Sequence, residues 1–167
     1  MARSSDWEQL AYRPLTAPWA AALELFRFAG AWAPLPETID SGWGAWAGDE
    51  LSGALITERA GARGMLHGPV VVAPPDVSAD SAFEVATALL ANALDGTGGH
   101  MIDTMFTRPQ GLDRLWVRQG FIPLPESELP PALRGRPGLG LYGWRGGTAL
   151  WSTAGRNGPR VKASPSR

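Results

Sequence analysis

"HMIDTMFTRPQGLDRLWVRQGFIPL", residues His100–Leu124, is the stretch of this sequence that decides the fold. In its first part, residues 100–107, Met101, Asp103 and Met105 alternate with Ile102, Thr104 and Phe106, as side chains on the two faces of a β-strand do. The segment 111–119 is typical of a short helix, which Gly120 ends. The last residues, 121–125, are typical of a strand whose prolines confine it to a sheet edge or end it early. The stretch therefore predicts a strand, a helix and a second strand in succession.

The residues before this stretch predict the rest of an α/β domain. In chain order, the expected elements are a strand at 12–15, a helix at 18–30 with Thr16 as its N-cap, strands at 43–47, 51–58 and 65–74, and a helix at 81–94. Consecutive valines at 70–72 indicate a strand buried on both faces. Ser81 and Glu84 match a capping box at the start of the second helix. A strand–helix–strand crossover from Val70 to Phe106 implies one parallel pair in an otherwise antiparallel sheet.

The two ends of the chain are expected to lie outside this domain. Residues 1–11 are interpreted as a loose leader without the apolar segment of a signal peptide. A last strand is expected at 139–144. Residues 146–167, with four basic residues and no acidic residue, are interpreted as a flexible basic tail. The domain itself is therefore expected to span 12–145.

Composition narrows the classes of function. A chain of 167 residues with 44 % hydrophobic and 19 % charged residues fits one soluble globular domain. A net charge of −1 and the lack of an apolar run of about 20 residues favour neither nucleic acid nor a membrane as partner. The four charges of the tail are too few to change that expectation. The absence of cysteine excludes disulfides and thiol catalysis and is typical of a cytoplasmic protein. The two histidines, His67 and His100, show no metal-ligand spacing.

Four segments together resemble the GNAT superfamily of acyl-CoA-dependent N-acyltransferases. They are "WAGDELSGALI" (46–56), "MLHGPVVVAP" (65–74), the helix at 81–94 and "LDRLWVRQGF" (112–121). The resemblance covers about residues 12–145. It implies an α/β fold with a mixed sheet of six to seven strands, flanking helices, and a central parallel pair that begins with the fourth strand.

The resemblance also implies a site for acyl-CoA between the fourth and fifth strands, which splay apart in GNAT proteins. Backbone groups of Val71, Val72 and Ala73 would pair with the pantetheine arm. The pyrophosphate would lie at the start of the next helix, where residues 81–86 align with the family's Gln/Arg-x-x-Gly-x-Gly/Ala turn. The expected contacts there are the backbone amides of Phe83, Glu84, Val85 and Ala86.

This turn departs from the family pattern at two positions. Ser81 stands where GNAT proteins carry glutamine or arginine, and Glu84 stands in place of the first glycine. A carboxylate about 4 Å from a pyrophosphate is repelled by roughly 1–4 kcal/mol per charge pair. A capping role for Glu84 explains this residue without any ligand, so both interpretations stay open.

Arg108 and Gln110 follow the fifth strand and are further candidates for coenzyme binding. Gln110 resembles the amide side chain that GNAT proteins place against the pantetheine. Arg108 could hold a phosphate or a carboxylate through both terminal guanidinium nitrogens. The alternative is that Gln110 and Asp113 cap the next helix.

The resemblance implies a base for the amine and, in many relatives, a tyrosine that protonates the leaving thiolate. Trp116 occupies the position of that tyrosine, and its indole N–H is no proton donor near neutral pH. Tyr142 is the expected substitute. The candidate bases are His67, Glu58 and Asp103.

Each candidate base also has a structural interpretation. His67 could be a satisfied histidine beside the following Gly-Pro pair, and Glu58 a solvated charge at a strand end. Asp103 could be a buried carboxylate that pairs with Arg108 or Arg114.

The sequence therefore leads to one expected function and one alternative. The expected function is transfer of an acyl group from acyl-CoA, with acetyl-CoA as the donor, by direct attack of an amine on a small molecule or a protein, without a metal. The alternative is a GNAT-fold protein that has lost the reaction and serves as a binding or regulatory subunit. Eight tryptophans and the loop at 127–138 are compatible with an interface, either to a second copy in a homodimer or to another protein.

Overall fold

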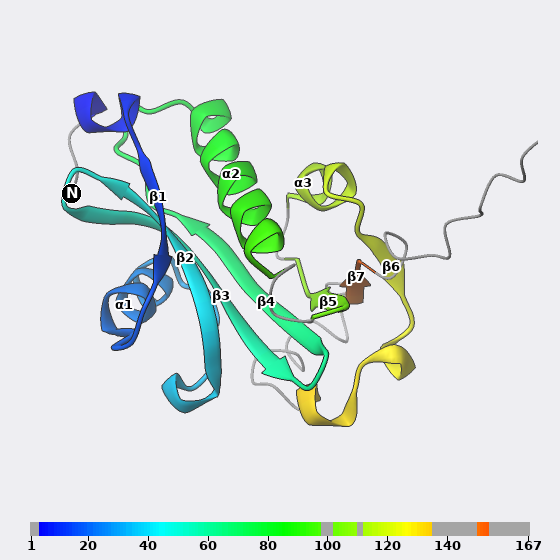
Figure 1. Ribbon diagram of the computed structural model, residues 1–167. Coiled ribbons are helices and arrows are strands. Elements are labelled where there is room, and N and C mark those ends of the chain that lie inside the picture. Colours follow the sequence, from blue (N-terminus) through cyan, green and yellow to red (C-terminus); the bar gives the residue numbers. More distant parts are fainter. Residues whose placement is uncertain (1–3, 98–101, 110–111, 135–149, 154–167) are drawn as a thin grey trace, which may run out of the picture.

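The computed structural model describes residues 4–97, 102–109, 112–134 and 150–153, which form a mixed sheet flanked by helices (Figure 1). The strands are β1 (Ala11–Leu15), β2 (Ile39–Ala47), β3 (Glu50–Ala60), β4 (Arg63–Val71), β5 (Thr104–Thr107), β6 (Ile122–Leu124) and β7 (Leu150–Ser152). The α-helices are α1 (Ala20–Phe28), α2 (Ala79–Thr97) and α3 (Asp113–Arg118). Short 3-10 helices are η1 (Ser4–Glu8), η2 (Pro36–Thr38), η3 (Glu126–Glu128) and η4 (Pro131–Leu133).

The sheet has the order β1-β2-β3-β4-β5-β7-β6, and β4 and β5 are its parallel pair. The predicted fold class is therefore confirmed. Strands β2, β3 and β4 form a meander whose connections are two residues long, because Ala47 pairs with Glu50 and Ala60 with Arg63. Each connection begins with a glycine in the left-handed region, Gly48 at φ 62° and Gly61 at φ 60°. Tight hairpin turns of this kind favour glycine.

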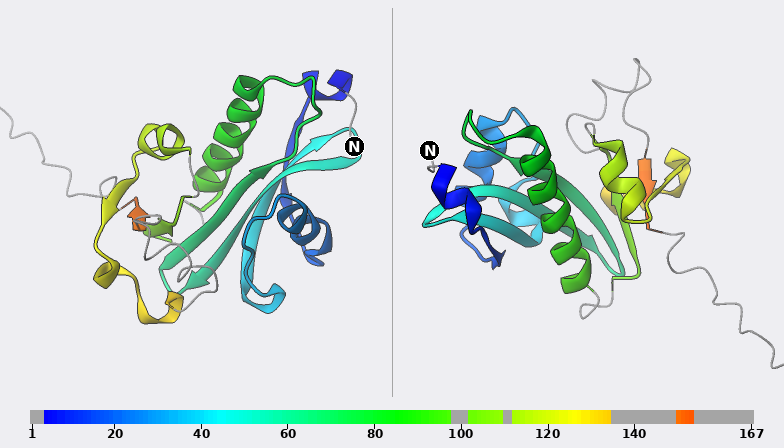
Figure 2. Two further views of the ribbon diagram at one scale, coloured as in Figure 1. Left: turned by 180° about the vertical axis from the view of Figure 1, so that it is seen from behind. Right: turned by 90° about the horizontal axis from the view of Figure 1, so that it is seen from above.

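Helices cover both faces of the sheet, as the views of Figure 2 show. On one face, Phe26 of α1 packs with Ile56 of β3 and Val70 of β4. On the other face, Leu90 of α2 packs with Leu55 of β3 and Leu66 of β4. Successive strand residues point to opposite faces, so Leu55 and Ile56 belong to the two different core clusters. We call these faces the α1 face and the α2 face.

Two elements correct the predicted helix starts. The helix α1 begins at Ala20 after Trp19, with no side-chain hydrogen bond at its N-cap, so Thr16 is not its cap. The helix α2 begins at Ala79, and the Ser81 N–H donates to Ser78 Oγ at 3.1 Å. Ser81 is therefore in the third helical position and Ser78 caps the helix, so the predicted capping box of Ser81 and Glu84 is wrong.

The ends of the chain take a larger part in the fold than predicted. The leader is not loose where the structure describes it, because Trp7 and Leu10 pack against Val85 and Leu89 of α2. The predicted tail is wrong for residues 150–153: β7 lies between β5 and β6 and pairs with both. A strand of three residues carries too little local pattern to be recognised in the sequence. The strand predicted at 139–144 lies outside the described residues.

Two absences hold for the part of the chain that the structure describes. None of its helices is long and apolar enough to cross a membrane. No group of three or more histidine, aspartate or glutamate side chains in it is arranged to hold a metal ion.

Candidate functional site

The parallel pair in the centre of the sheet is short, and β4 and β5 then diverge. Pairing runs from Arg63–Thr104 to Leu66–Thr107, whereas β4 continues to Val71. Within the described residues, no strand pairs with β4 on this side beyond Leu66. An extended ligand could pair with backbone groups along that edge, as an added strand does.

A β-bulge lies where this divergence begins. Ala54 pairs with Val70 and Ile56 with His67, so one residue of β3 faces two of β4 between these pairs. Bulges bend a strand and increase its twist. Gly68 lies within the bulge at φ 91°, and a Cβ there would stand 3.0 Å from Ala54 O. Both the backbone conformation and the close approach require glycine at this position.

His67 and Glu58 meet on the α1 face at the same level of the sheet. His67 pairs with Ile56 across the strands, and Glu58 lies two residues beyond Ile56, so all three side chains share this face. His67 Nε2 lies 2.8 Å from Glu58 Oε2, with the two side chains 5 % and 2 % exposed. The edge of the Trp32 ring lies against the imidazole, with 4.7 Å between the ring centroids.

The contact fixes the partner of one imidazole nitrogen. Which of the two atoms donates depends on the tautomer of the ring, and an ionised Glu58 would accept the hydrogen bond from Nε2. Because Glu58 is buried, it is not the solvated strand-end charge of the structural interpretation. A histidine held by a carboxylate in this way is a chemically suitable proton acceptor.

The start of α2 does not offer the predicted amide cradle. The Ala82 N–H donates to Ser78 O at 3.1 Å, and Phe83 to Ala86 follow inside the helix. Their amides are therefore engaged in helical hydrogen bonds, and the predicted alignment lies too far along the chain. The loop before the helix contains Pro74 and Pro75, which have no N–H to donate.

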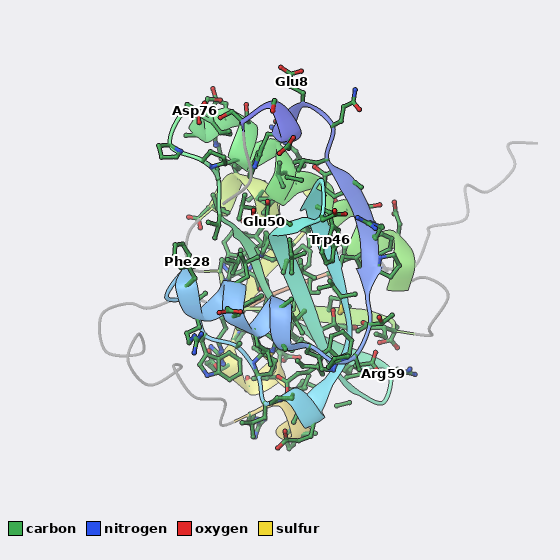
Figure 3. All side chains as sticks on the ribbon, turned by 90° about the vertical axis from the view of Figure 1, so that its left-hand side faces the viewer. Glu8, Phe28, Trp46, Glu50, Arg59 and Asp76 are labelled. Carbon is green, nitrogen blue, oxygen red and sulfur yellow. The ribbon has the colours of Figure 1, made fainter. Side chains whose placement is uncertain are left out.

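The same end of the molecule is acidic. Asp76 precedes α2, where it accepts a hydrogen bond from Ser4 Oγ, and Asp80 lies in the first helical turn. Figure 3 shows Asp76 and Glu8 at one end of the molecule and Arg59 at the other. No lysine or arginine occurs between Arg63 and Arg108, so the connection from β4 through α2 to β5 carries neither residue type. Carboxylates at a helix start oppose the attraction of an anion to the helix dipole.

Glu84 and Phe83 face α3. Glu84 Oε1 lies 3.7 Å from Arg118 Nη1 in a solvent-exposed ion pair. The guanidinium carbons of Arg114 and Arg118 lie 5.0 Å and 5.5 Å from the centroid of the Phe83 ring. Both distances are typical of cation–π contacts. The contact of α2 with α3 is therefore lined by two arginines.

Arg108, a predicted contact of the coenzyme, forms an ion pair with Glu126 of this chain. Its two terminal nitrogens donate to the two carboxylate oxygens of Glu126, and the Nη2–Oε2 distance is 2.5 Å. The hydrogen bond from Arg108 lowers the pKa of Glu126 below its usual range. Both terminal guanidinium nitrogens are thus engaged away from any coenzyme. Gln110 lies outside the described residues.

Asp103 lies away from the other candidate bases. It precedes β5, its side chain is 61 % exposed, and Oδ1 lies 3.4 Å from Nε of Arg63. The expectation of a buried carboxylate paired with Arg108 or Arg114 is therefore wrong. The strand begins at Thr104 and not at His100 as predicted, so Asp103 precedes it, at the end of the sheet where β4 and β5 are still paired.

The structure describes the residue at the position of the family's tyrosine but not its expected substitute. Trp116 is 1 % exposed and packs edge-to-face on Phe121, 5.0 Å between ring centroids, so it belongs to the core. Tyr142 lies outside the described residues. Val71 is at the end of β4, and Val72 and Ala73 follow it. The Val72 N–H donates to Ser52 O at 2.8 Å.

Sequence reasoning assigned no role in the site to three residues of this region. Trp32 lies in the segment after α1, and no pattern in the sequence connects it with His67. Arg114 and Arg118 are one helical turn apart in the sequence, which is a signal for a shared face. Both arginines face the ring of Phe83, and the packing of α3 on α2 determines this contact.

Comparisons with known proteins extend these observations. No protein-family model matches this sequence, and no curated protein matches it by sequence. Solved structures do match. An acetyltransferase of the GNAT family from Staphylococcus aureus Mu50 has a TM-score of 0.60 at 9 % identity, over 86 % of this chain and 98 % of that one. The ribosomal-protein-S18-alanine N-acetyltransferase from Escherichia coli has a TM-score of 0.57 at 14 % identity, over 86 % and 92 %.

A third match is the N-acetylglutamate synthase from Neisseria gonorrhoeae, solved with coenzyme A and N-acetyl-glutamate. Its TM-score is 0.58 at 16 % identity, over 86 % of this chain but only 34 % of that one. At these identities the likeness concerns the fold. The resemblance to the GNAT superfamily is therefore confirmed at that level: this chain has the GNAT fold.

Proposed function

We propose that this protein binds an acyl-CoA, with acetyl-CoA as the donor, and transfers the acyl group directly to an amine on a small molecule or a protein. The observation that carries the proposal is the position of the buried His67–Glu58 pair, at the level where β4 leaves β5. A thioester held along the free edge of β4 would lie beside this pair. The GNAT fold of the chain supports the same assignment, although a fold alone does not establish an activity.

The chemical step needs one proton acceptor. The amine nitrogen attacks the carbonyl carbon of the thioester, the C–N bond forms, and the C–S bond breaks with its electron pair on sulfur. The amine loses a proton, and His67 is the acceptor in this proposal because it is held by Glu58 at this level of the sheet. Glu58 acts through His67: it keeps the ring in one orientation and stabilises the imidazolium. Positioning of the two reactants supplies much of the remaining rate enhancement.

The test uses the full-length protein, acetyl-CoA and a panel of amines that includes small polyamines, amino acids and peptides with free N-termini. Release of the free thiol reports turnover, and mass spectrometry identifies the acylated amine. In His67→Gln we expect the turnover rate to fall by about a hundredfold or more, with little change in the dissociation constant of acetyl-CoA. Thermal unfolding of the variant shows whether the buried substitution is tolerated.

Glu58→Gln distinguishes positioning from a purely structural role. A neutral amide no longer stabilises the imidazolium, so the acid limb of the pH–rate profile should move to lower pH and the maximal rate should fall. Asp103→Asn is the matched control, because this exposed carboxylate is paired with Arg63 outside the site. Unchanged turnover in a folded His67→Gln protein would contradict the proposed role of the pair.

A second candidate function is a GNAT-fold binding or regulatory subunit without transfer activity. The acidic, proline-containing start of α2 favours it, because this end lacks the amide cradle implied by the family resemblance. Burial of Trp116 in the core points the same way, since no acid replaces the family's tyrosine within the described residues. Failure of every amine in the panel, together with measurable binding of acyl-CoA, would favour this candidate.

A further inference from the structure

The phosphates of an acyl-CoA would need a positive site, and the usual place for it is missing in this chain. Asp76 and Asp80 flank the start of α2, and two prolines precede it. No positive side chain lies between Arg63 and Arg108 to offset these carboxylates. A pyrophosphate at this helix start would therefore be repelled by these two carboxylates.

Two positive side chains on the α2 face belong to α3. Arg114 and Arg118 are four residues apart, so their side chains lie on one side of the helix. Both are exposed, and both guanidinium groups stand over the ring of Phe83, at 5.0 Å and 5.5 Å. The ring restrains the two groups while leaving their N–H donors to solvent or to a ligand. Two arginines restrained in this way match the oxygens of phosphate groups.

These arginines lie where a coenzyme leaving β4 would arrive. Val71, at the end of β4, and Phe83 of α2 pack against the same core cluster, which also contains Leu115 and Trp116 of α3. The free edge of β4 and the contact between α2 and α3 therefore belong to one face of the molecule. His67 and Glu58 lie on the opposite face, so donor and acceptor would approach the divergence of β4 and β5 from different sides.

We propose that Arg114 and Arg118 hold the phosphate groups of the coenzyme across the contact of α2 with α3, in place of the helix start. This inference rests on the proposed function, since it assumes that the ligand is a coenzyme A thioester. Glu84 is part of the arrangement: its carboxylate lies 3.7 Å from Arg118 and competes with a phosphate for that guanidinium. Arg114 and Arg118 thus strengthen binding of the coenzyme, whereas Glu84 weakens it.

The test measures binding of CoA by isothermal titration calorimetry to the full-length protein. Arg114→Gln and Arg118→Gln should each weaken binding about tenfold, and the loss should shrink as the salt concentration rises. Glu84→Gln should strengthen binding by up to about tenfold. Arg63→Gln is the matched control, because this arginine also pairs with an exposed carboxylate but lies at the other end of β4. The affinity of the Arg63→Gln protein for CoA should equal that of the wild type.

Shorter probes assign the phosphates. If the 3′-phosphate is held, dephospho-CoA should bind more weakly than CoA to the wild type, and 3′,5′-ADP should bind in an arginine-dependent manner. If only the pyrophosphate is held, CoA and dephospho-CoA should bind alike, and both should lose affinity in the arginine variants. Either result supports the site.

The outcomes separate this inference from the proposed function. CoA binding that is unaffected in Arg114→Gln and Arg118→Gln overturns the arginine site, whatever the transfer assay shows. Wild-type protein that binds no CoA at millimolar concentration also overturns it. Arginine-dependent binding without transfer to any amine supports the site and instead overturns the proposed reaction.

Discussion

Gly120 shows at the scale of one residue how a helix end is specified. It follows α3 at φ 80°, as predicted for the glycine that ends this helix. Its N–H donates to Val117 O and the Phe121 N–H donates to Trp116 O, both at 3.0 Å. These two hydrogen bonds are those of a Schellman motif, which requires a left-handed residue at this position.

Replacing Gly120 by valine should therefore destabilise the fold. A β-branched side chain in the left-handed region costs about 1–2 kcal/mol, so the free energy of unfolding should fall by at least that amount. Gly120→Asn is the control and should lose less, because asparagine tolerates this conformation. Chemical denaturation of the three proteins measures the difference. Equal stability of Gly120→Val and the wild type would be incompatible with the motif.

At the scale of elements, the start of α2 decides what the crossover can bind. The helix begins before the predicted position, with Ser78 rather than the Ser81–Glu84 pair at its N-cap. The shift encloses the amides of Phe83 to Ala86 within the helix and turns Glu84 toward α3. The helix starts two residues earlier than predicted, so one expected phosphate site is lost, and its first turns contact the arginines of α3.

Ser78→Ala tests this helix start. Loss of the cap should lower the free energy of unfolding by about 1 kcal/mol, because the Ser81 N–H loses its acceptor. Glu84→Gln is the comparison and should change stability by less than about 0.5 kcal/mol, since exposed ion pairs contribute little. Thermal unfolding followed by circular dichroism is sufficient. A larger loss in Glu84→Gln than in Ser78→Ala would restore the capping box.

At the scale of the whole molecule, β7 completes the sheet from a segment distant in sequence. Leu150 and Ser152 are 1 % and 0 % exposed, and Thr153 exchanges two hydrogen bonds with Met105, at 2.9 Å and 3.0 Å. The strand joins β5 to β6, so the C-terminal third of the sheet depends on it.

A chain that ends at residue 146 should therefore lose more than about 3 kcal/mol of stability or fail to unfold cooperatively. It lacks a buried leucine and the hydrogen bonds of an inner strand. A chain that ends at residue 154 is the control, because it keeps β7, and it should lose much less. Denaturant titration of the two truncated proteins provides the comparison. Equal stability of the two would show that β7 contributes nothing to the fold.

The sequence by itself determined the elements whose signals are local. The hairpins follow from glycine turns flanked by strand residues, and the end of α3 follows from Gly120. The order of strands and helices, read together, was enough to predict the parallel pair and the GNAT fold. His67 and Glu58 were recognisable as candidate bases because their chemistry is visible in the residue type. All of these signals act over a few neighbouring residues, where backbone sterics and side-chain periodicity decide the structure.

Only the tertiary structure decided which side chains meet. The bulge at Gly68 sets the register that brings His67 to Glu58, and a shift of one residue would turn either side chain to the other face. Arg108 pairs with Glu126, and Asp103 pairs with Arg63. Where the strands end and where the loops run determines which of these charged groups come within ion-pair distance. The strand β7 is defined by its pairing with the edges of both β5 and β6. Such contacts depend on register and packing across the whole sheet, which no local pattern encodes.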